Sequence, residues 1–154
     1  MNILIVDDNE PLRENLKAIL QPYGECTLVE DGETAVQTFQ AALRAGNPFK
    51  LVLLDIVMPG IDGKEALLQI RRMEKELYGA KHQREQSAHI LMQTSMHRSD
   101  QMLSAFSKGC DGYVMKPVDK EKLLARLSKS GIIPPLDAET GKNAAPNPAN
   151  IQHS

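Results

Sequence analysis

Short apolar runs alternate with helical patterns along this chain of 154 residues, and this alternation limits the folds that the chain can adopt. Runs of this length, rich in β-branched residues and separated by helices, are typical of βαβ units, in which a parallel sheet has both faces covered. The sequence therefore predicts an α/β fold built on a parallel sheet. Its strands are expected near residues 2–6, 24–29, 51–55, 89–94 and 111–115.

Proline, glycine and acidic residues mark where the intervening helices begin and end. The first helix is expected to begin at Pro11 and to end before Pro22, and the second opens at Asp31. A third begins near Gly63, a fourth lies around residues 100–108 and a fifth around 119–129. The charged stretch 74–86, which delays the fourth strand, is interpreted as a solvated helix extension or loop.

The length of the chain fits one ordinary domain with a single core. This domain is predicted to span residues 1–130. From Gly131 onward the sequence is rich in Pro, Asn, Ala and Gly and has little apolar periodicity. Residues 131–154 are therefore interpreted as a flexible C-terminal tail or linker.

Charge and hydropathy exclude two classes of function. The net charge is −2 and no strongly basic block is present, which argues against a nucleic-acid-binding module. No apolar stretch approaches the roughly 20 residues needed to cross a bilayer, so a cytoplasmic protein without a membrane partner is expected. Cys26 and Cys110 form no CxxC pair and are interpreted as two reduced core thiols.

Reactive polar side chains follow the apolar runs at the expected strand ends. Because the carboxyl ends of parallel strands meet at one edge of a sheet, these groups are expected to converge. Neighbouring carboxylates repel one another unless a cation neutralises them, and Mg²⁺ with oxygen ligands suits such a site. A carboxylate nucleophile, a metal and a fixed ammonium are the requirements of phosphoryl transfer. The residues concerned are Asp7, Asp8, Asp55, Thr94, Ser95 and Lys116.

Each of these residues taken alone has a simpler explanation. Asp8 or Asn9 is able to cap the helix that Pro11 begins, and Asp62 to cap the next one. Thr94 is equally well an ordinary loop hydroxyl, and Lys116 a solvated lysine. Their joint placement at the strand ends favours a site.

In order and position, these motifs resemble the receiver domain of two-component response regulators. The resemblance implies a flavodoxin-like (βα)5 fold, a doubly wound parallel sheet in the order 2-1-3-4-5. It covers residues 2 to about 130. The motifs that carry it are Asp7-Asp8, Leu54-Asp55, Met58-Pro59 with Asp62-Gly63, Thr94-Ser95 and Lys116-Pro117.

The resemblance implies that Asp55 is the phosphoacceptor and takes the phosphoryl group from a sensor histidine kinase or a histidine phosphotransfer protein. Mg²⁺ would be the cofactor. Asp8 and Asp55 would bind it directly, Asp7 through water, and the backbone carbonyl of Val57 would complete the protein ligands.

The resemblance also implies a switch. Lys116 would pair with Asp55 and then with the phosphoryl group, and Thr94 would be the hydroxyl that binds this group. Tyr113 would move inward behind Thr94, and the bond before Pro117 would be cis. The output would be binding to an unknown downstream protein, either by a stand-alone receiver or by a fragment of a larger regulator or hybrid kinase.

Two residues bear on how long a phosphoryl group would last. Val57 and Met96, each two residues beyond a site residue, are expected to flank the path of the hydrolytic water. Both are apolar, so slow self-dephosphorylation is predicted. The chain is accordingly expected to act as a signalling switch that assists its own phosphorylation and dephosphorylation, and not as an enzyme.

Two alternatives are less well supported. A haloacid-dehalogenase-like Mg²⁺-dependent phosphatase also uses a strand-end Asp, Mg²⁺ and a Lys. It requires a second Asp two residues after the nucleophile, where this chain has Asn9 or Val57. A non-phosphorylatable adaptor fits poorly, because every site position holds a competent residue.

Overall fold

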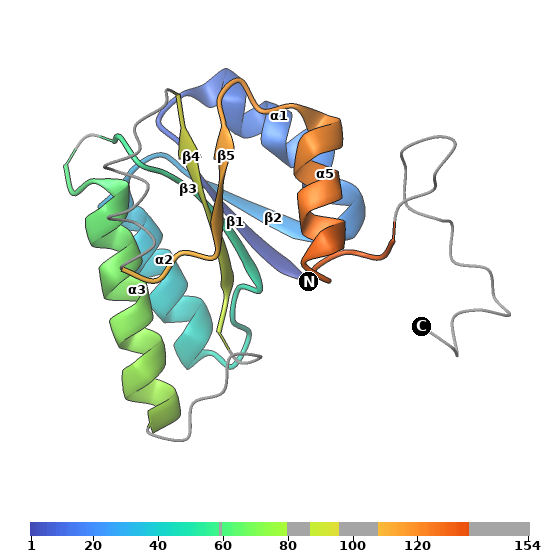
Figure 1. The fold of residues 1–154 in the computed structure, drawn as a ribbon. Coiled ribbons are helices and arrows are strands. Elements are labelled where there is room, and N and C mark those ends of the chain that lie inside the picture. The colour runs from blue at the N-terminus through green and yellow to red at the C-terminus, as the bar shows by residue number, and fades with distance from the viewer. Residues whose placement is uncertain (59, 80–86, 96–107, 136–154) are drawn as a thin grey trace, which may run out of the picture. The chain divides into compact units, whose positions relative to one another are not determined.

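The computed structural model describes residues 1–58, 60–79, 87–95 and 108–135. The chain divides into two compact units, Met1–Val118 and Asp119–Ser154, and each is described by itself. The first unit contains a parallel five-stranded sheet, and the second contains one described helix (Figure 1).

The sheet has the order β2-β1-β3-β4-β5, and every neighbouring pair is parallel, so the predicted flavodoxin-like topology is confirmed. Each strand begins and ends within about one residue of its predicted bounds. The three inner strands are flanked by strands on both sides, which explains their nearly continuous apolar sequences. The strands are β1 (Asn2–Val6), β2 (Glu25–Val29), β3 (Leu51–Asp55), β4 (His89–Thr94) and β5 (Gly112–Met115).

Helices cover both faces of the sheet, α1 (Glu10–Leu20) on one face and α2 (Gly32–Arg44) and α3 (Gly63–Tyr78) on the other (Figure 1). Alternate side chains of a strand point to opposite faces. Residues on one face of the sheet therefore pack in a single core cluster with the apolar sides of α2 and α3. Its members include Leu4, Val6, Val52, Leu54, Ile90, Met92, Ala35, Phe39, Leu43, Ala66, Leu67 and Ile70.

Side-chain caps fix where these helices begin. Asn9 accepts a hydrogen bond from the Leu12 amide at 3.0 Å and so caps α1, leaving Asp8 without that role. Asp31 caps α2 through the Thr34 amide at 2.7 Å. Asp62 caps α3 through the Glu65 amide at 2.9 Å, as the sequence suggested. The short 3-10 helix η1 (Gln21–Tyr23) then leads from α1 toward β2.

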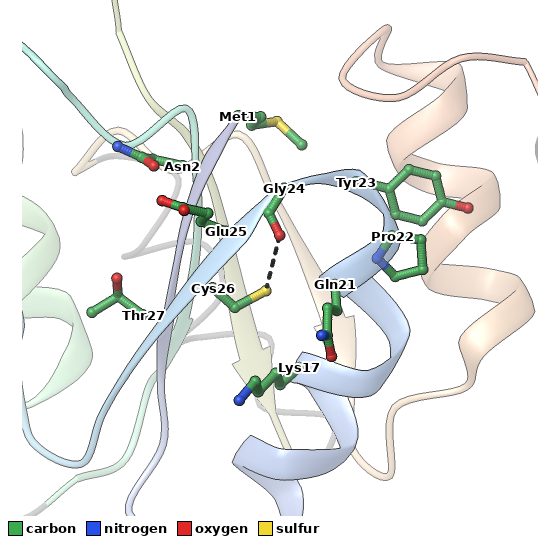
Figure 2. Close-up of a pocket in the computed structure, with 10 residues that line it drawn as sticks. All are labelled: Met1, Asn2, Lys17, Gln21, Pro22, Tyr23, Gly24, Glu25, Cys26 and Thr27. Carbon is green, nitrogen blue, oxygen red and sulfur yellow. Dashed lines mark hydrogen bonds between the residues drawn. The ribbon is translucent and has the colours of Figure 1, made fainter. Parts of the chain in front are cut away.

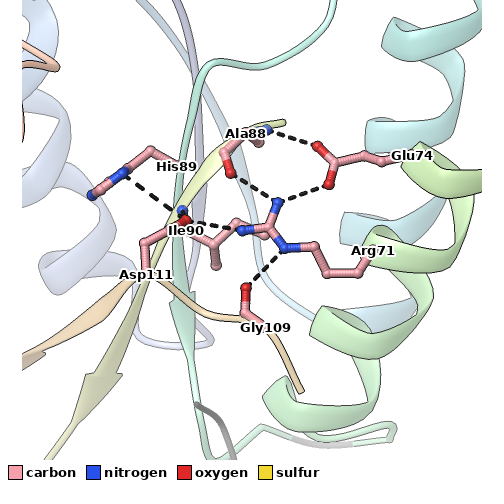
Figure 3. Close-up of polar contacts among 7 residues, drawn as sticks. All are labelled: Arg71, Glu74, Ala88, His89, Ile90, Gly109 and Asp111. Carbon is pink, nitrogen blue, oxygen red and sulfur yellow. Dashed lines mark hydrogen bonds and ion pairs between the residues drawn. The ribbon is translucent and has the colours of Figure 1, made fainter. Parts of the chain in front are cut away.

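The third helix corrects one sequence-based interpretation. Its last turns enter the charged stretch that was interpreted as solvated, yet Glu74 is only 1% exposed. The Glu74 carboxylate accepts hydrogen bonds from Arg71 at 2.7 Å and from the Ala88 amide at 2.7 Å (Figure 3). A charged residue in this stretch therefore holds the start of β4 in place, and the stretch is not wholly solvated.

Arg71 is the centre of a polar network at the amino ends of β4 and β5 (Figure 3). Its guanidinium donates to the Ala88 and Gly109 carbonyls, both at 2.8 Å, and to Asp111 at 2.9 Å. Asp111 also accepts from the Ile90 amide at 2.8 Å. This network, formed by Arg71, Glu74 and Asp111 with the backbone around them, is called the Arg71 network below.

The second unit is described here by its helix α5 (Lys120–Lys129). Asp119 caps this helix by accepting from the Lys122 amide at 3.0 Å. Leu123, Leu124 and Leu127 are buried, which confirms the apolar side predicted from their spacing. The helix predicted around residues 100–108 lies almost entirely outside the described residues.

An open groove of about 830 Å³ lies at the amino ends of β1 and β2, beside the end of α1 (Figure 2). Cys26 lines this groove and is only half buried, so it is not the core thiol that the sequence predicted, whereas Cys110 is buried. Both cysteines are reduced thiols, and burial raises the pKa of Cys26 above its ordinary value. None of the described helices is long and apolar enough to cross a membrane.

Candidate functional site

Two buried carboxylates stand at the carboxyl edge of the sheet. Asp55 is the last residue of β3, and Asp7 directly follows β1, the neighbouring strand. They are 5% and 0% exposed, respectively. The local backbone supports both, since the Val57 amide donates to Asp55 Oδ1 at 3.1 Å and the Asn9 amide donates to Asp7 Oδ1 at 2.9 Å. Each carboxylate therefore has one oxygen held by its own loop and a second one directed elsewhere.

The Lys116 ammonium, which follows β5, lies between these second oxygens. Its Nζ is 2.7 Å from Asp55 Oδ2 and 3.0 Å from Asp7 Oδ2. The contact with Asp55 is a hydrogen bond, whereas Asp7 Oδ2 is buried and has no aligned hydrogen-bond donor among the described residues. The contact between Lys116 and Asp7 is therefore an ion pair only, because the two charged atoms are close but are not aligned for a hydrogen bond.

A third carboxylate, the exposed Asp8, completes the cluster. One oxygen from each of Asp7, Asp8 and Asp55 lies within 4.8 Å of the others. Three clustered carboxylates, two of them paired with one ammonium, leave an excess of negative charge, and one buried oxygen lacks a donor in the part of the chain that the structure describes. A hard divalent cation corrects both deficits, because it takes carboxylate oxygens as ligands. The donor set therefore fits Mg²⁺.

Burial and charge shift the proton affinities of the two central groups. Burial raises the pKa of Asp55 above its ordinary value, although Lys116 opposes the shift. Burial alone would lower the pKa of Lys116, but the hydrogen bond to Asp55 and the negative charges of Asp55 and Asp7 outweigh it, so the pKa rises. The ammonium therefore stays charged at neutral pH, while a negative charge on Asp55 is poorly solvated.

Comparison with known proteins agrees with this geometry. The family model of the response regulator receiver domain matches residues 3–128. The chain is 32% identical over 126 residues to the chemotaxis protein CheY of Halobacterium salinarum. The aligned region covers 82% of this chain and 92% of that protein. The chain belongs to the response regulator receiver domain family.

Two further proteins are similar to this receiver domain, one in sequence and one in solved structure. It is 31% identical to the nitrate/nitrite response regulator NarL of Escherichia coli, over 83% of this chain but only 53% of that protein. The receiver domain of Ssk1 from Saccharomyces cerevisiae, solved with the histidine phosphotransfer protein Ypd1, matches with a TM-score of 0.72 and 26% identity. That match covers 92% of this chain and 95% of the other.

Thr94 and Tyr113 lie on β4 and β5, the two strands that follow β3 in the sheet. Thr94 ends β4 and is 3% exposed, and its carbonyl accepts a hydrogen bond from the Lys116 amide at 2.6 Å. Tyr113 is half-buried on β5 and packs against the core cluster. The Lys116–Pro117 peptide bond is cis. Ser95 is exposed, and Met96 lies outside the described residues.

In the loop after β3, the side chain of Val57 is exposed and the backbone of Gly63 comes very close to that of Asp55. Val57 is 58% exposed beside Asp55, whereas Met58 is buried. The Gly63 amide donates to the Ile56 carbonyl at 2.9 Å, and a Cβ on Gly63 would collide with the Asp55 carbonyl oxygen. Only glycine therefore allows α3 to begin this close to Asp55. The neighbouring Pro59 lies outside the described residues.

Two supporting residues were not identified from the sequence. Arg13 donates to the Asp7 carbonyl at 2.7 Å from the first turns of α1, which holds the loop that carries Asp7 and Asp8. Gln93 donates from β4 to the Val6 carbonyl at 3.3 Å. Gln93 was identifiable in principle, because it is a polar residue inside the apolar run of β4. Arg13 was not, because an arginine on the polar face of a helix is common.

Proposed function

We propose that this receiver domain is a phosphorylation switch in which Asp55 accepts a phosphoryl group from a phosphohistidine. A carboxylate oxygen of Asp55 attacks phosphorus, and the bond from phosphorus to the imidazole nitrogen breaks. The electron pair of that bond stays on the imidazole, which then takes up a proton. The product on this chain is an acyl phosphate.

One observation carries the proposal: Asp55 is buried, is paired with Lys116 at 2.7 Å, and lies within 4.8 Å of two further carboxylates. A carboxylate of this kind is held in one orientation and is incompletely neutralised. Both properties favour attack on a positioned phosphorus, because phosphoryl transfer depends mostly on positioning and on charge neutralisation.

Mg²⁺ is the proposed cofactor. Asp8 and Asp55 would hold it directly, Asp7 through water, and the Val57 carbonyl would complete the protein ligands. When bound, it neutralises negative charge on the transferred phosphoryl group. The residues of the chain position the reacting groups. Lys116 holds Asp55 in place, and the amides of Val57 and Asn9 orient the carboxylates of Asp55 and Asp7, respectively.

The proposed output is a change in a protein-binding surface. A phosphoryl group adds negative charge and three acceptor oxygens at Asp55, which favours any conformation that brings Lys116 and Thr94 closer. Tyr113 would then move inward behind Thr94. The likeness to a receiver domain solved together with Ypd1 supports a histidine phosphotransfer protein or a histidine kinase as the donor.

The test is phosphorylation by a small phosphoryl donor, acetyl phosphate, followed by intact-mass measurement. The wild-type chain with MgCl₂ is expected to gain one phosphoryl group, and excess EDTA is expected to prevent the gain. Asp55→Asn is expected to abolish it. The matched control is Asp62→Asn, which alters an exposed capping residue of the same loop and is expected to leave phosphorylation unchanged, because asparagine also caps helices.

A phosphotransfer profile against candidate histidine kinases would then identify the donor. Phosphorylation of the Asp55→Ala protein at the same rate as wild type would contradict the proposal. No observation favours the phosphatase alternative, because the position two residues after Asp55 is the apolar and exposed Val57.

A further inference from the structure

Gln93 is a neutral amide near the carboxyl end of a largely apolar strand. It is the second-last residue of β4 and is paired in register with Asp55 of β3. Its exposure is 0%, as is that of Ile90, Leu91 and Met92 in the same strand. Fully buried glutamine is uncommon unless its amide is well bonded, so its contacts require an explanation.

The contacts of Gln93 lead to both buried carboxylates of the site. Its backbone carbonyl accepts from the Ile56 amide at 3.1 Å, and Ile56 directly follows Asp55. Its side-chain Nε2 donates to the Val6 carbonyl at 3.3 Å, and Val6 directly precedes Asp7. Since β3 lies between β4 and β1, this side chain reaches past the strand of Asp55 to the strand of Asp7.

These bonds satisfy the amide poorly. A distance of 3.3 Å is longer than the usual N–H···O bond, and Gln93 Oε1 is buried without a hydrogen-bond partner in the part of the chain that the structure describes. An apolar residue of similar volume would remove the unpaired Oε1 and would lose only the long bond to the Val6 carbonyl. A residue that breaks the core pattern in this way beside a reactive site is expected to serve that site.

We propose that Gln93 is a positioning residue for the metal-binding carboxylates. It links the backbone before Asp7 to the backbone after Asp55, and so sets how the two carboxylates face one another. Its side chain does not touch the metal and acts through the Val6 carbonyl, whereas its bond to the Ile56 amide is made by the backbone and remains in any variant. This inference rests on the proposed function, because it concerns Mg²⁺ held by that site.

The experiment compares Mg²⁺ affinity with stability in the full chain. MgCl₂ binding is measured by isothermal titration calorimetry, and urea unfolding is measured without Mg²⁺. Gln93→Met, which keeps the volume and removes the amide, is expected to bind Mg²⁺ about tenfold more weakly, as is usual when a supporting contact of a metal ligand is lost. Its unfolding midpoint is expected to equal or exceed that of wild type.

Met92→Leu is the matched control, because it alters the neighbouring buried residue of β4, which belongs to the core cluster with α2 and α3. Its Mg²⁺ affinity is expected to equal that of wild type. Gln93→Leu is a second variant with the same expectation as Gln93→Met. A purely structural role would lower the unfolding midpoint and leave the Mg²⁺ affinity of the folded protein unchanged.

The outcomes separate the two proposals. If wild type and a folded Gln93→Met protein bind Mg²⁺ equally, the inference about Gln93 is overturned and the proposed function stands. If wild type binds no Mg²⁺, both are overturned. If neither Gln93 variant shows a cooperative urea transition, the residue serves the fold alone, and the inference is again overturned.

Discussion

The first unit of this protein contains two buried charge clusters, one at each end of its sheet. The carboxyl edge holds Asp7 and Asp55 around Lys116, and the amino edge holds the Arg71 network (Figure 3). Each cluster sets two largely buried carboxylates against one cation. They differ in how completely those charges are hydrogen-bonded, and this difference separates the Arg71 network from the cluster that is proposed to react.

In the Arg71 network the bonds are short and numerous. The guanidinium donates four hydrogen bonds of 2.7–2.9 Å, two to carboxylates and two to backbone carbonyls. The carboxylates also accept from the Ala88 and Ile90 amides. The planar guanidinium fixes this geometry, so the network has one preferred arrangement.

The site at the carboxyl edge is less complete. Within the described residues, Lys116 makes one aligned hydrogen bond to a carboxylate and Asp7 Oδ2 has no aligned donor. Asp8 adds a third carboxylate. A compact ammonium exchanges partners more readily than a guanidinium fork does. The comparison therefore indicates that, in this protein, the incompletely paired buried charge lies where a ligand is proposed to act.

The largest expected effect comes from breaking the Arg71 network. Arg71→Ala leaves Glu74 and Asp111 buried without their cation, so the free energy of unfolding should fall by about 3–5 kcal/mol. Urea unfolding measures this. Arg72→Ala is the control, because Arg72 is exposed on the same helix and should change stability little. Similar stabilities of the two variants would show that the network is not structural.

A second prediction concerns access of water to the carboxyl edge. Val57 is exposed and apolar, and replacing it together with Met96 by polar residues should let water be oriented toward an acyl phosphate. The Val57→Asn, Met96→Glu protein is expected to lose its phosphoryl group at least about tenfold faster than wild type. Phosphate release after removal of acetyl phosphate measures the lifetime. An unchanged lifetime would rule out this explanation of slow self-dephosphorylation.

A third prediction is that neutralising the reactive carboxylate stabilises the fold. Because burial raises the pKa of Asp55, its charged form is disfavoured in the folded state. Without Mg²⁺, Asp55→Asn should therefore unfold with a free energy about 1 kcal/mol higher at neutral pH. Below the ordinary value of 3.8 both side chains are neutral, so the difference should vanish. It should grow as the pH rises through the elevated pKa of the folded protein.

Urea titrations of wild type and Asp55→Asn across this pH range would provide the check. A variant less stable than wild type at neutral pH would mean that the pair with Lys116 outweighs the cost of burying the charge.

The smallest effect is expected at Asp31, a carboxylate that belongs to neither cluster. It serves as the reference against which the changes in the two clusters are compared. Hydrogen bonds from Thr34 lower the pKa of Asp31 below 3.8, so its charge stabilises α2 above that pH, and the stabilisation is lost as the pH falls through the lowered pKa. Asparagine also caps helices, so Asp31→Asn should cost only about a few tenths of a kcal/mol near neutral pH. Thermal unfolding measured from pH 7 downward should show this cost at pH 7 and a smaller cost as the pH falls through the lowered pKa.

Much of the fold was predictable because its signals are local. Apolar runs, prolines and capping residues such as Asp31 and Asp62 placed the strands and most helix starts correctly. The convergence of Asp7, Asp8, Asp55 and Lys116 was also predictable, since the carboxyl ends of parallel strands share one edge.

The features that were missed depend on contacts between distant residues. Glu74 is charged and was interpreted as solvated, because its partners include the Ala88 amide, which lies 14 residues away. Asp111 lies 40 residues from Arg71, so no local pattern connects them. Cys26 was expected in the core but lies on β2, an edge strand with one neighbour.

The contact between Gly63 and the backbone of Asp55 has a practical consequence. Since α3 begins against the carbonyl of the proposed phosphoacceptor, a shift of that backbone must displace the first turn of the helix as well. A fluorophore attached at the half-exposed Lys64 would therefore sense events at the site without any change to its residues. The protein thus offers a natural position for an optical sensor of its own phosphorylation.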